Sequence, residues 1–299
     1  MVELRKSANE GFLLLDAGNH FTSTSKNPCD APGKVDEVLE AYRIMAYDAI
    51  NLSQNDLILG TPFLQQKAQS LELPLLSTNL REKKTGKCLF APYVIEQAGK
   101  LKVAVFGLME DSPANEKTSN AYTVENPFDT ARETVKVLNS KADLIICLSS
   151  LSPEKNTRLL DEIPDIDFIV STDKRVHAPF KRKNGYVLSS GNKGRYLGSL
   201  DIFLGSLQRP LHLQDLSKTK RLKSNLSRSE KAIAGLEERH ETIAASDDPQ
   251  IKQRFKQEVE RLQEWATKYR EELVQLASAD NSFKNTVLPL VAQKSRKSP

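Results

Sequence analysis

The sequence predicts a mixed α/β domain followed by a helical hairpin. Short apolar runs alternate with amphipathic stretches over residues 1–213, a pattern typical of strands and helices around a partly parallel sheet. The composition changes after about Gln214, where apolar residues begin to recur in steps of four and three positions. A short polar break, SDDP, separates two such runs. Two antiparallel amphipathic helices are therefore expected after the α/β domain.

The first elements of the α/β domain can be placed in order. The apolar run FLLLDAG, residues 12–18, ends in a glycine turn and predicts a buried strand. Apolar residues at helical spacing predict a helix from Lys34 to Ala46. Further strands are expected at AINL, at PLLSTNL and in the pair APYVIEQAG and KLKVAVFGL, which bends at Ala98-Gly99.

The second half of this domain continues the alternation. Residues 127–140 predict a helix, and DLIICLSS predicts the buried strand that follows it. Ser152 and Pro153 provide an N-cap and a proline at the first helical position, so a helix is expected from there to Ile163. The runs DFIVS, YVLSSG and SLDIFLG complete the predicted strands.

The hairpin is expected in residues 214–280, and its spacing is coiled-coil-like. The recurring apolar residues form a stripe along one side of each helix, and Ser229 and His240 interrupt the first stripe. Asp248 with Pro249 predicts the start of the second helix. Trp265 lies one residue before a stripe position, where it can anchor a protein partner, a second copy or the α/β domain. The expected stripes are residues 222, 226, 229, 233, 236, 240 and 243, then 251, 255, 259, 262, 266, 269, 273 and 276. A terminal strand and a basic tail are expected in residues 281–299.

The charge and hydropathy of the chain narrow the classes of partner. The net charge is +4, and the basic residues are spread along the sequence, so a nucleic-acid partner is not expected. No run approaches the roughly 18 apolar residues that a membrane-spanning helix needs. The first residues, MVELRKSANEG, lack the apolar stretch of a signal peptide, and localisation stays open.

The three cysteines, Cys29, Cys88 and Cys147, match no zinc, haem or redox spacing. Cys147 lies in the apolar run LIICL and is expected in the core. Cys29 lies in the loop NPCDAP, where a reactive thiol and an ordinary exposed cysteine are both consistent with the sequence.

Several segments together resemble the 5'-nucleotidase-like metallophosphatases of the calcineurin-like metallophosphoesterase superfamily. LLLDAGN resembles the family's LLLDAGD, and AYDAINLSQNDLILG resembles the stretch that usually contains Gly-Asn-His-Glu. LPLLSTNL, KVAVFGL, DLIICLSSLS, DIDFIVSTDKR and SSGNKGRYLGSLDI follow in the family's order, and Gly194 to Gly198 are the most specific part. The resemblance covers about residues 10–205. It implies a four-layer α/β/β/α sandwich, a site for two divalent metals at the strand ends, and an exported protein.

The metal-binding positions of that family are largely replaced. Its chemistry needs two metals about 3.5–4 Å apart, bridged by a carboxylate. The resemblance places Asn19 at the bridging position, and a neutral amide cannot hold two cations together. The family's first-strand Asp-x-His would precede Met1. The other ligand positions carry Gln54, Asn55, Ser150, Asp173 and Arg175. No metal cofactor is therefore expected, although these six polar residues should still converge at one cleft.

Other site chemistries remain open on the sequence alone. His20, Asp56, Asp173 and His177 could build a smaller metal site, or they could serve as turn-capping and solvated residues. Asp16 is expected to cap the turn at Gly18. Arg175 and Arg195 could attract an anion, or they could be ordinary surface arginines.

Three function hypotheses follow. The first is an inactive metallophosphatase-like module that binds or assembles, with the hairpin as its docking element. The second is an active phosphoesterase whose missing ligands lie on a segment before Met1. The third is a thiol or redox protein that uses Cys29. The family's first strand has no counterpart in this sequence. This suggests either a fragment of a longer protein or a substitute strand at Val2–Ser7.

Overall fold

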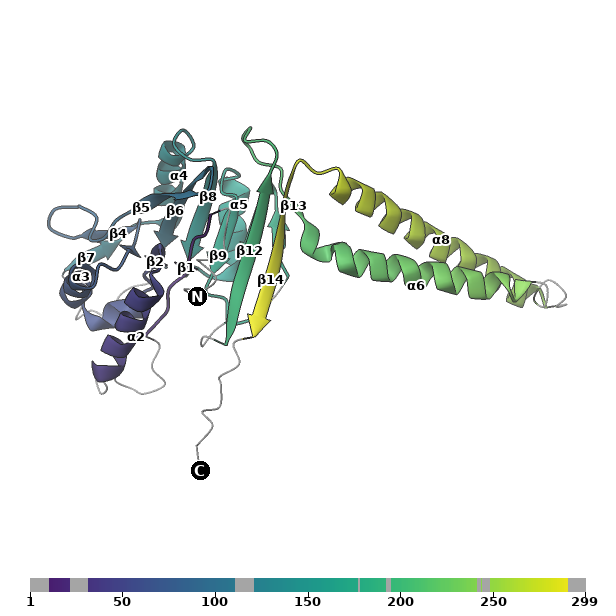
Figure 1. Ribbon diagram of the computed structural model, residues 1–299, viewed down its shortest axis with the longest axis horizontal. Coiled ribbons are helices and arrows are strands. Elements are labelled where there is room, and N and C mark those ends of the chain that lie inside the picture. The colour runs from purple at the N-terminus through teal and green to yellow at the C-terminus, as the bar shows by residue number, and fades with distance from the viewer. Residues whose placement is uncertain are drawn as a thin grey trace, which may run out of the picture. The chain divides into compact units, whose positions relative to one another are not determined.

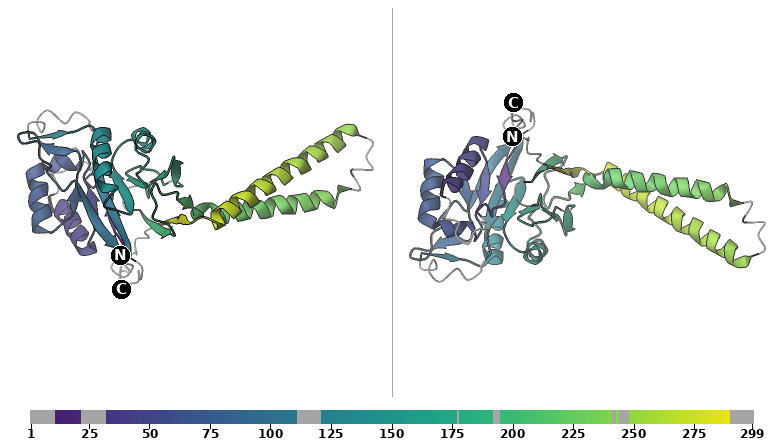
Figure 2. Two further views of the ribbon diagram at one scale, coloured as in Figure 1. Left: turned by 90° about the horizontal axis from the view of Figure 1, so that it is seen from above. Right: turned by 90° about the horizontal axis from the view of Figure 1, so that it is seen from below.

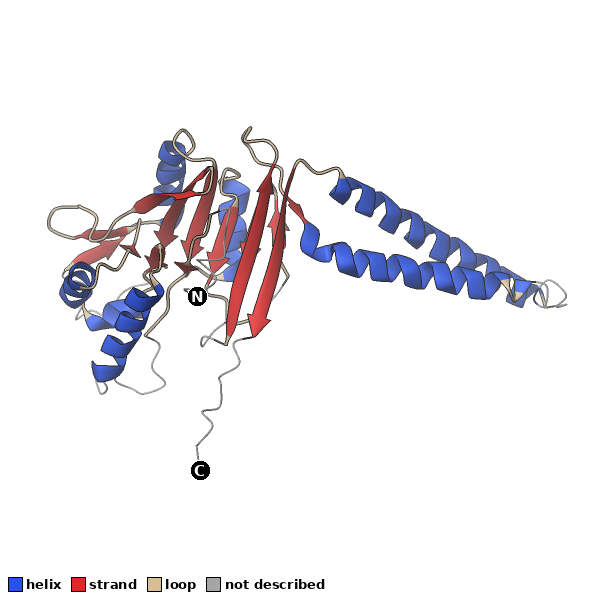
Figure 3. Cartoon of the chain, viewed as in Figure 1, coloured by secondary structure: helices blue, strands red, loops and turns tan. Residues whose placement is uncertain are grey.

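The computed structural model of the 299-residue chain describes residues 11–21, 32–110, 121–176, 178–191, 195–240, 243 and 248–289. It divides into two compact units (Figures 1 and 3). The first comprises Met1–Gly198, Leu207–Leu211 and Val287–Pro299, and the second comprises Ser199–Ser206 and His212–Thr286. Cys29, His177, Gly194 and the expected substitute strand at Val2–Ser7 lie outside the described residues.

A six-stranded sheet, ordered β10-β11-β9-β8-β6-β5, is the centre of the first unit. Its inner strands run parallel and its two edge strands run antiparallel to their neighbours. All six residues of β8 are buried, which explains the uninterrupted apolar run LIICLS. The strands are β5 (Tyr93–Ala98), β6 (Leu101–Leu108), β8 (Leu144–Ser149), β9 (Phe168–Ser171), β10 (Phe180–Arg182) and β11 (Gly185–Leu188).

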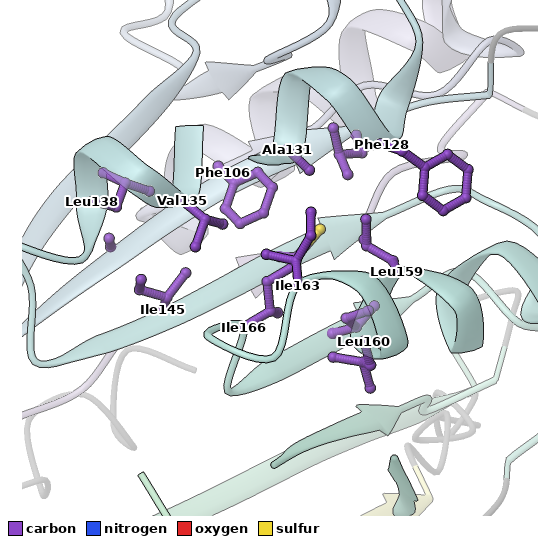
Figure 4. Close-up of a cluster of buried hydrophobic side chains, with 14 of the residues drawn as sticks. Phe106, Phe128, Ala131, Val135, Leu138, Ile145, Leu159, Leu160, Ile163 and Ile166 are labelled. Atoms are coloured by element: carbon purple, nitrogen blue, oxygen red, sulfur yellow. The ribbon is translucent and has the colours of Figure 1, made fainter. Parts of the chain in front are cut away.

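Helices α4 (Pro127–Leu138) and α5 (Pro153–Glu162) pack against this sheet. Figure 4 shows their apolar side chains meeting Phe106 and Ile145 of the sheet in one buried cluster. The predicted N-cap of α5 is confirmed, because the Ser152 hydroxyl accepts a hydrogen bond from the Lys155 amide. Cys147 is fully buried in this cluster, as predicted.

A second sheet of parallel strands, ordered β1-β2-β3, lies in the same unit. The expected strand PLLSTNL is shorter than predicted: only Leu75–Leu76 form β3, and Leu80 begins β4. A further antiparallel pair joins β4 and β7. The elements are β1 (Leu15–Asp16), α2 (Pro32–Met45), β2 (Ala49–Asn51), η2 (Asp56–Leu59), α3 (Thr61–Ser70), β3 (Leu75–Leu76), β4 (Leu80–Glu82) and β7 (Tyr122–Val124).

The second unit joins a three-stranded sheet to two long helices. The sheet order is β12-β14-β13, with β12 (Tyr196–Leu204), β13 (Gln214–Asp215) and β14 (Asn281–Pro289). A short turn, η3 (Leu216–Lys218), leads into α6 (Thr219–Glu237). The predicted start of α8 (Pro249–Ala277) is confirmed, because the Asp248 carboxylate accepts a hydrogen bond from the Gln250 amide at 2.8 Å.

Helices α6 and α8 form an antiparallel hairpin (Figure 2). The side chains buried between them are Leu222, Ser229, Leu262, Ala266 and Leu276. Each of these five was predicted to lie on a stripe, so the helical spacing identified the facing sides correctly. Within the described ranges, no helix combines the length and the apolar composition needed to cross a bilayer.

Candidate functional site

The turn after β1 is the first part of the candidate site. Gly18 and Asn19 both have positive φ, +105° and +71°, so the chain reverses sharply there. The Asp16 carboxylate accepts a hydrogen bond from the Gly18 amide at 2.9 Å, which confirms the predicted cap. A Cβ atom on Gly18 would lie 3.0 Å from the Asn51 carbonyl oxygen, so the turn packs closely on the end of β2.

The buried carboxylate of Asp56 fixes this turn. It accepts five hydrogen bonds, from the amides of Asn19, His20, Phe21 and Ser53 and from the Ser53 hydroxyl. Their lengths run from 2.8 to 3.1 Å. The side chain is 0% exposed, so nearly all of its hydrogen-bonding capacity is met by the protein. Asp56 therefore joins the loop after β2 to the turn after β1.

His20 lies between two carboxylates. Its Nε2 atom is 2.9 Å from Asp16 Oδ1, and its Nδ1 atom is 3.6 Å from Asp56 Oδ2. Tyr42 donates its hydroxyl proton to the other Asp16 oxygen at 2.9 Å. We call His20, Asp16 and Asp56 the histidine clamp. The clamp connects β1, the loop after β2 and, through Tyr42, helix α2.

In the histidine clamp, each ionised side chain stabilises the opposite charge of its neighbour. Burial disfavours the imidazolium, but the neighbouring charges of Asp16 and Asp56 raise the pKa of His20 to about 10. Burial likewise opposes ionisation of Asp56, but His20 and the hydrogen bonds hold the pKa of its carboxyl at about 2. Burial also opposes ionisation of Asp16, but His20 and the hydrogen bonds from Gly18 and Tyr42 lower the pKa of its carboxyl. His20 is therefore a cation at neutral pH and has no lone pair to offer a metal.

The exchange His20→Gln should reduce stability most below about pH 6.5, the ordinary pKa of an imidazole. A pKa raised in the folded state gives stability that is complete below the unfolded pKa and declines as pH rises through the folded pKa, here about 10. The difference in unfolding free energy between parent and variant should shrink between about pH 6.5 and 10. Urea unfolding followed by circular dichroism measures it, and a difference that stays constant over this range would show that His20 carries no charge.

The sequence-predicted site residues lie at the ends of neighbouring strands. Asn55 donates from its amide nitrogen to Asn19 Oδ1 at 2.8 Å, so these two are brought together. The Ser150 hydroxyl follows β8 and is 3.4 Å from the Leu108 carbonyl at the end of β6. Gln54 lies between Ser53 and Asn55 in the loop that Asp56 holds.

Asp173 and Arg175 follow β9, the strand next to β8. The Arg175 amide donates to the Asp173 carboxylate at 3.0 Å, while the Arg175 side chain is 81% exposed. Arg195 is also exposed, directly before β12. Convergence of all six replaced positions on one cleft stays a prediction.

Two buried asparagines that link strand ends were not predicted from the sequence. Asn51 donates to the carbonyls of Ala17 and Leu108, at 2.8 and 3.1 Å, and so links the ends of β1, β2 and β6. A Cβ atom on Gly107 would lie 2.2 Å from Asn51 Oδ1, so the glycine makes room for this link. Asn79 donates to the Met109 and Glu125 carbonyls. An asparagine inside an apolar run, as in AINL, could have indicated such a link, because a buried amide requires hydrogen-bond partners.

The described residues do not fit a pair of divalent cations. No group of three or more His, Cys, Asp or Glu side chains in this part of the chain could hold a metal ion. The amides of Asn19 and Asn55 bond to each other, and the imidazole of His20 is protonated between Asp16 and Asp56. Neutral amides and a buried cation offer little to two metals that need carboxylate and neutral imidazole ligands.

Comparison with curated proteins finds relatives over part of the chain. Protein UshA of Escherichia coli is 29% identical over 149 residues, which are 48% of this chain and 26% of UshA. The uncharacterized metallophosphoesterase YunD of Bacillus subtilis is 26% identical over 218 residues, which are 71% of this chain and 46% of YunD. Among solved structures, a 5'-nucleotidase precursor from Thermus thermophilus has a TM-score of 0.56 at 19% identity, over 68% of this chain and 44% of that protein.

The chain is similar to members of the 5'-nucleotidase and calcineurin-like phosphoesterase superfamily in sequence and in fold. The sequence-based resemblance and fold class are thus confirmed. The chain spans about a quarter of the length of UshA and less than half of YunD. No protein-family model matches it. Within the superfamily fold, the turn after β1 and the loop after β2 hold Asn19 and Asn55 side by side where the resemblance implies a bridging carboxylate and an imidazole.

Proposed function

We propose that this chain is a phosphoesterase-fold module that has lost dinuclear metal catalysis and serves in binding or assembly. The observation that carries the proposal is the 2.8 Å hydrogen bond from Asn55 to Asn19. It engages the amide nitrogen of Asn55 and the amide oxygen of Asn19, at two positions where the resemblance implies metal ligands. A two-metal site generates the attacking hydroxide and clamps the phosphate, so its loss removes most of the catalytic power.

The histidine clamp supports the same proposal. His20 and Asp56 are charged groups near the replaced positions, yet each is committed to the other and to the backbone. Removing either from this arrangement in order to bind a cation would leave a buried charge without its partner, at a cost of several kcal/mol. The clamp therefore keeps the shape of the turn and the loop without the help of an ion.

A metal and activity assay tests the proposal. We expect the purified chain to contain no stoichiometric pair of manganese or zinc ions by mass spectrometry. We also expect no hydrolysis of nucleoside monophosphates or aryl phosphates when either metal is added. Both results follow from the missing bridging carboxylate, because one neutral amide cannot bind two divalent cations at close range.

The variant Asn19→Ala is the matched control for this assay. Trace hydrolysis that is unchanged in Asn19→Ala would come from a contaminating enzyme and would leave the proposal intact. Two bound metal ions together with metal-dependent turnover that Asn19→Ala abolishes would refute the loss of catalysis. That outcome would favour an active phosphoesterase.

The docking part of the proposed role is assigned to the hairpin of α6 and α8. Three large apolar side chains of α8 remain exposed in the chain, Ile251 at 46%, Trp265 at 45% and Val274 at 67%. Large rings on a rigid helix are common anchors because they bury a large area at a low entropy cost. The hairpin thus offers a surface on which a partner can dock.

A further inference from the structure

One broad side of the hairpin has a distinctive composition. In two antiparallel helices, the residue directly before each stripe position falls on the same side of both helices, and the residue directly after it falls on the other. Two ion pairs across the hairpin agree with this division. Lys218 pairs with Glu272, which precedes Leu273, whereas Arg270 and Glu230 pair on the other side, each directly after a stripe residue.

Basic residues gather on the first side, which we call the arginine face. Its basic members all directly precede stripe residues and are all exposed: Arg221, Arg228, Arg239, Arg254, Arg261 and Lys268. Its acidic residues, Glu258 and Glu272, are ion-paired with Arg261 and Lys218. Arg221, Arg228 and Arg254 form no ion pair with any described residue. The arginine face therefore carries uncompensated positive charge.

The opposite face is nearly balanced. The residues that directly follow stripe positions include the basic Lys223, Lys252, Lys256 and Arg270 and the acidic Glu230, Glu237 and Glu260. Lys256 lies 3.9 Å from Glu260, and Arg270 lies 2.7 Å from Glu230. The positive charge of the hairpin is thus concentrated on one side, and this side would repel its own copy in a second molecule.

Trp265 lies among these cations. It directly precedes Ala266, is 45% exposed, and has the Arg261 guanidinium 5.2 Å from its ring centre. A tryptophan flanked by cations is typical of surfaces that meet lipid headgroups, where the ring occupies the interface and the cations meet the phosphates. Heptad spacing along each helix, about 10.5 Å, arranges the charges in two rows rather than one line.

We propose that the arginine face binds an anionic phospholipid surface and inserts Trp265 at headgroup level. This inference rests on the docking role proposed for the hairpin, but not on the state of the metal positions. Two rows of cations on a rigid pair of helices match a two-dimensional array of phosphates better than the single backbone of a nucleic acid. Basic residues near such a surface each add attraction, and salt weakens it.

Vesicle binding of the full chain tests the proposal, because Trp265 is the only tryptophan and reports directly. Vesicles of phosphatidylglycerol and phosphatidylcholine in equal parts should shift Trp265 emission to the blue, and vesicles of phosphatidylcholine alone should not. The triple exchange of Arg221, Arg228 and Arg254 to Gln should lower the partition coefficient about 100-fold, at about fivefold for each charge. Circular dichroism verifies that each variant is folded.

The triple exchange of Lys223, Lys252 and Lys256 to Gln is the matched control, because it removes the same charge from the opposite face. It should bind the vesicles within about threefold of the parent if the arginine face is the contact. Equal loss in both triple variants, or no blue shift, would overturn the proposal. So would tighter binding of a single-stranded oligonucleotide than of the vesicles. A chain that ignores vesicles but self-associates through the hairpin in sedimentation would keep the docking role and lose only the lipid partner.

Discussion

Replacing Asp56 with alanine should lower the free energy of unfolding by about 3–5 kcal/mol, the range for removing one partner of a buried charge pair. The carboxylate accepts five hydrogen bonds and lies 3.6 Å from the buried His20 ring. Its loss leaves the amides of Asn19, His20 and Phe21 without their acceptor and the imidazolium with one counter-charge fewer. Urea unfolding followed by circular dichroism measures the change; Trp265 fluorescence is unsuitable, because that residue belongs to the second unit.

Asp129→Ala provides a control with the same chemical change at an exposed site. Asp129 bonds to Arg132 at 2.9 Å, and both side chains are more than half exposed. Exposed ion pairs contribute little, so we expect a loss below about 1 kcal/mol. Similar small losses in both variants would mean that the histidine clamp does not hold the turn. The intermediate variant Asp56→Asn keeps the shape but not the charge, and should fall between parent and alanine.

Replacing Arg209 with alanine should also lower the free energy of unfolding by about 3–5 kcal/mol near neutral pH. Its guanidinium donates to the carbonyls of Asp143 and Asp165 and to the Asp167 carboxylate, at 2.9, 2.6 and 3.1 Å. The Asp167 side chain is 2% exposed, and Arg209 is its cationic partner among the described residues, so the substitution would leave a buried charge unpaired there. Thermal or urea unfolding of both proteins at one pH gives the difference.

The cost of Arg209→Ala should depend on pH. Burial raises the pKa of Asp167 to about 6 even with Arg209 beside it. A carboxyl whose pKa is raised in the folded state stabilises most below its unfolded pKa, and this contribution is lost as pH rises through about 6. Without the guanidinium the pKa of Asp167 rises further. Arg209→Ala should therefore lose less unfolding free energy at about pH 5 than at about pH 7.5.

The double variant of Arg209→Ala with Asp167→Asn separates charge from packing. Its neutral amide can still accept the hydrogen bond from the Ile145 amide, which the carboxylate now accepts at 2.8 Å. We expect it to recover part of the stability lost in Arg209→Ala, and to lose most of the pH dependence. A double variant as unstable as the single one would show that the lost packing of the arginine stem dominates.

Asp56→Ala and Arg209→Ala both remove contacts that connect segments distant in sequence at the ends of strands. Asp56 joins the ends of β1 and β2, and Arg209 joins the segment after β12 to the loops around β8 and β9. Asp143 and Asp167 lie directly before β8 and β9, so Arg209 acts at the opposite ends of these strands from Ser150 and Asp173. If the proposed function is correct, Asp56 holds the turn after β1 and the loop after β2 through buried protein charges rather than through bound ions.

The sequence by itself determined the local elements and their order. The apolar run LIICLS predicts a strand that is buried on both faces, and Ser152 with Pro153 predicts the start of α5. Asp248 with Pro249 likewise predicts the start of α8. These signals are local, because hydrophobic period and capping chemistry depend on residues within a turn or two of one another. The fold class followed from the same alternation together with the resemblance of seven segments.

Only the tertiary structure decided which charges meet. Asp56 is 36 residues from His20, and no local pattern indicates that they lie in contact or that the imidazole is protonated between two carboxylates. The basic residues of the hairpin look evenly spread in the sequence, yet antiparallel packing of α6 and α8 brings five arginines to one face. Local spacing places a side chain on one side of its own helix or strand, whereas its partners depend on which distant segment packs there.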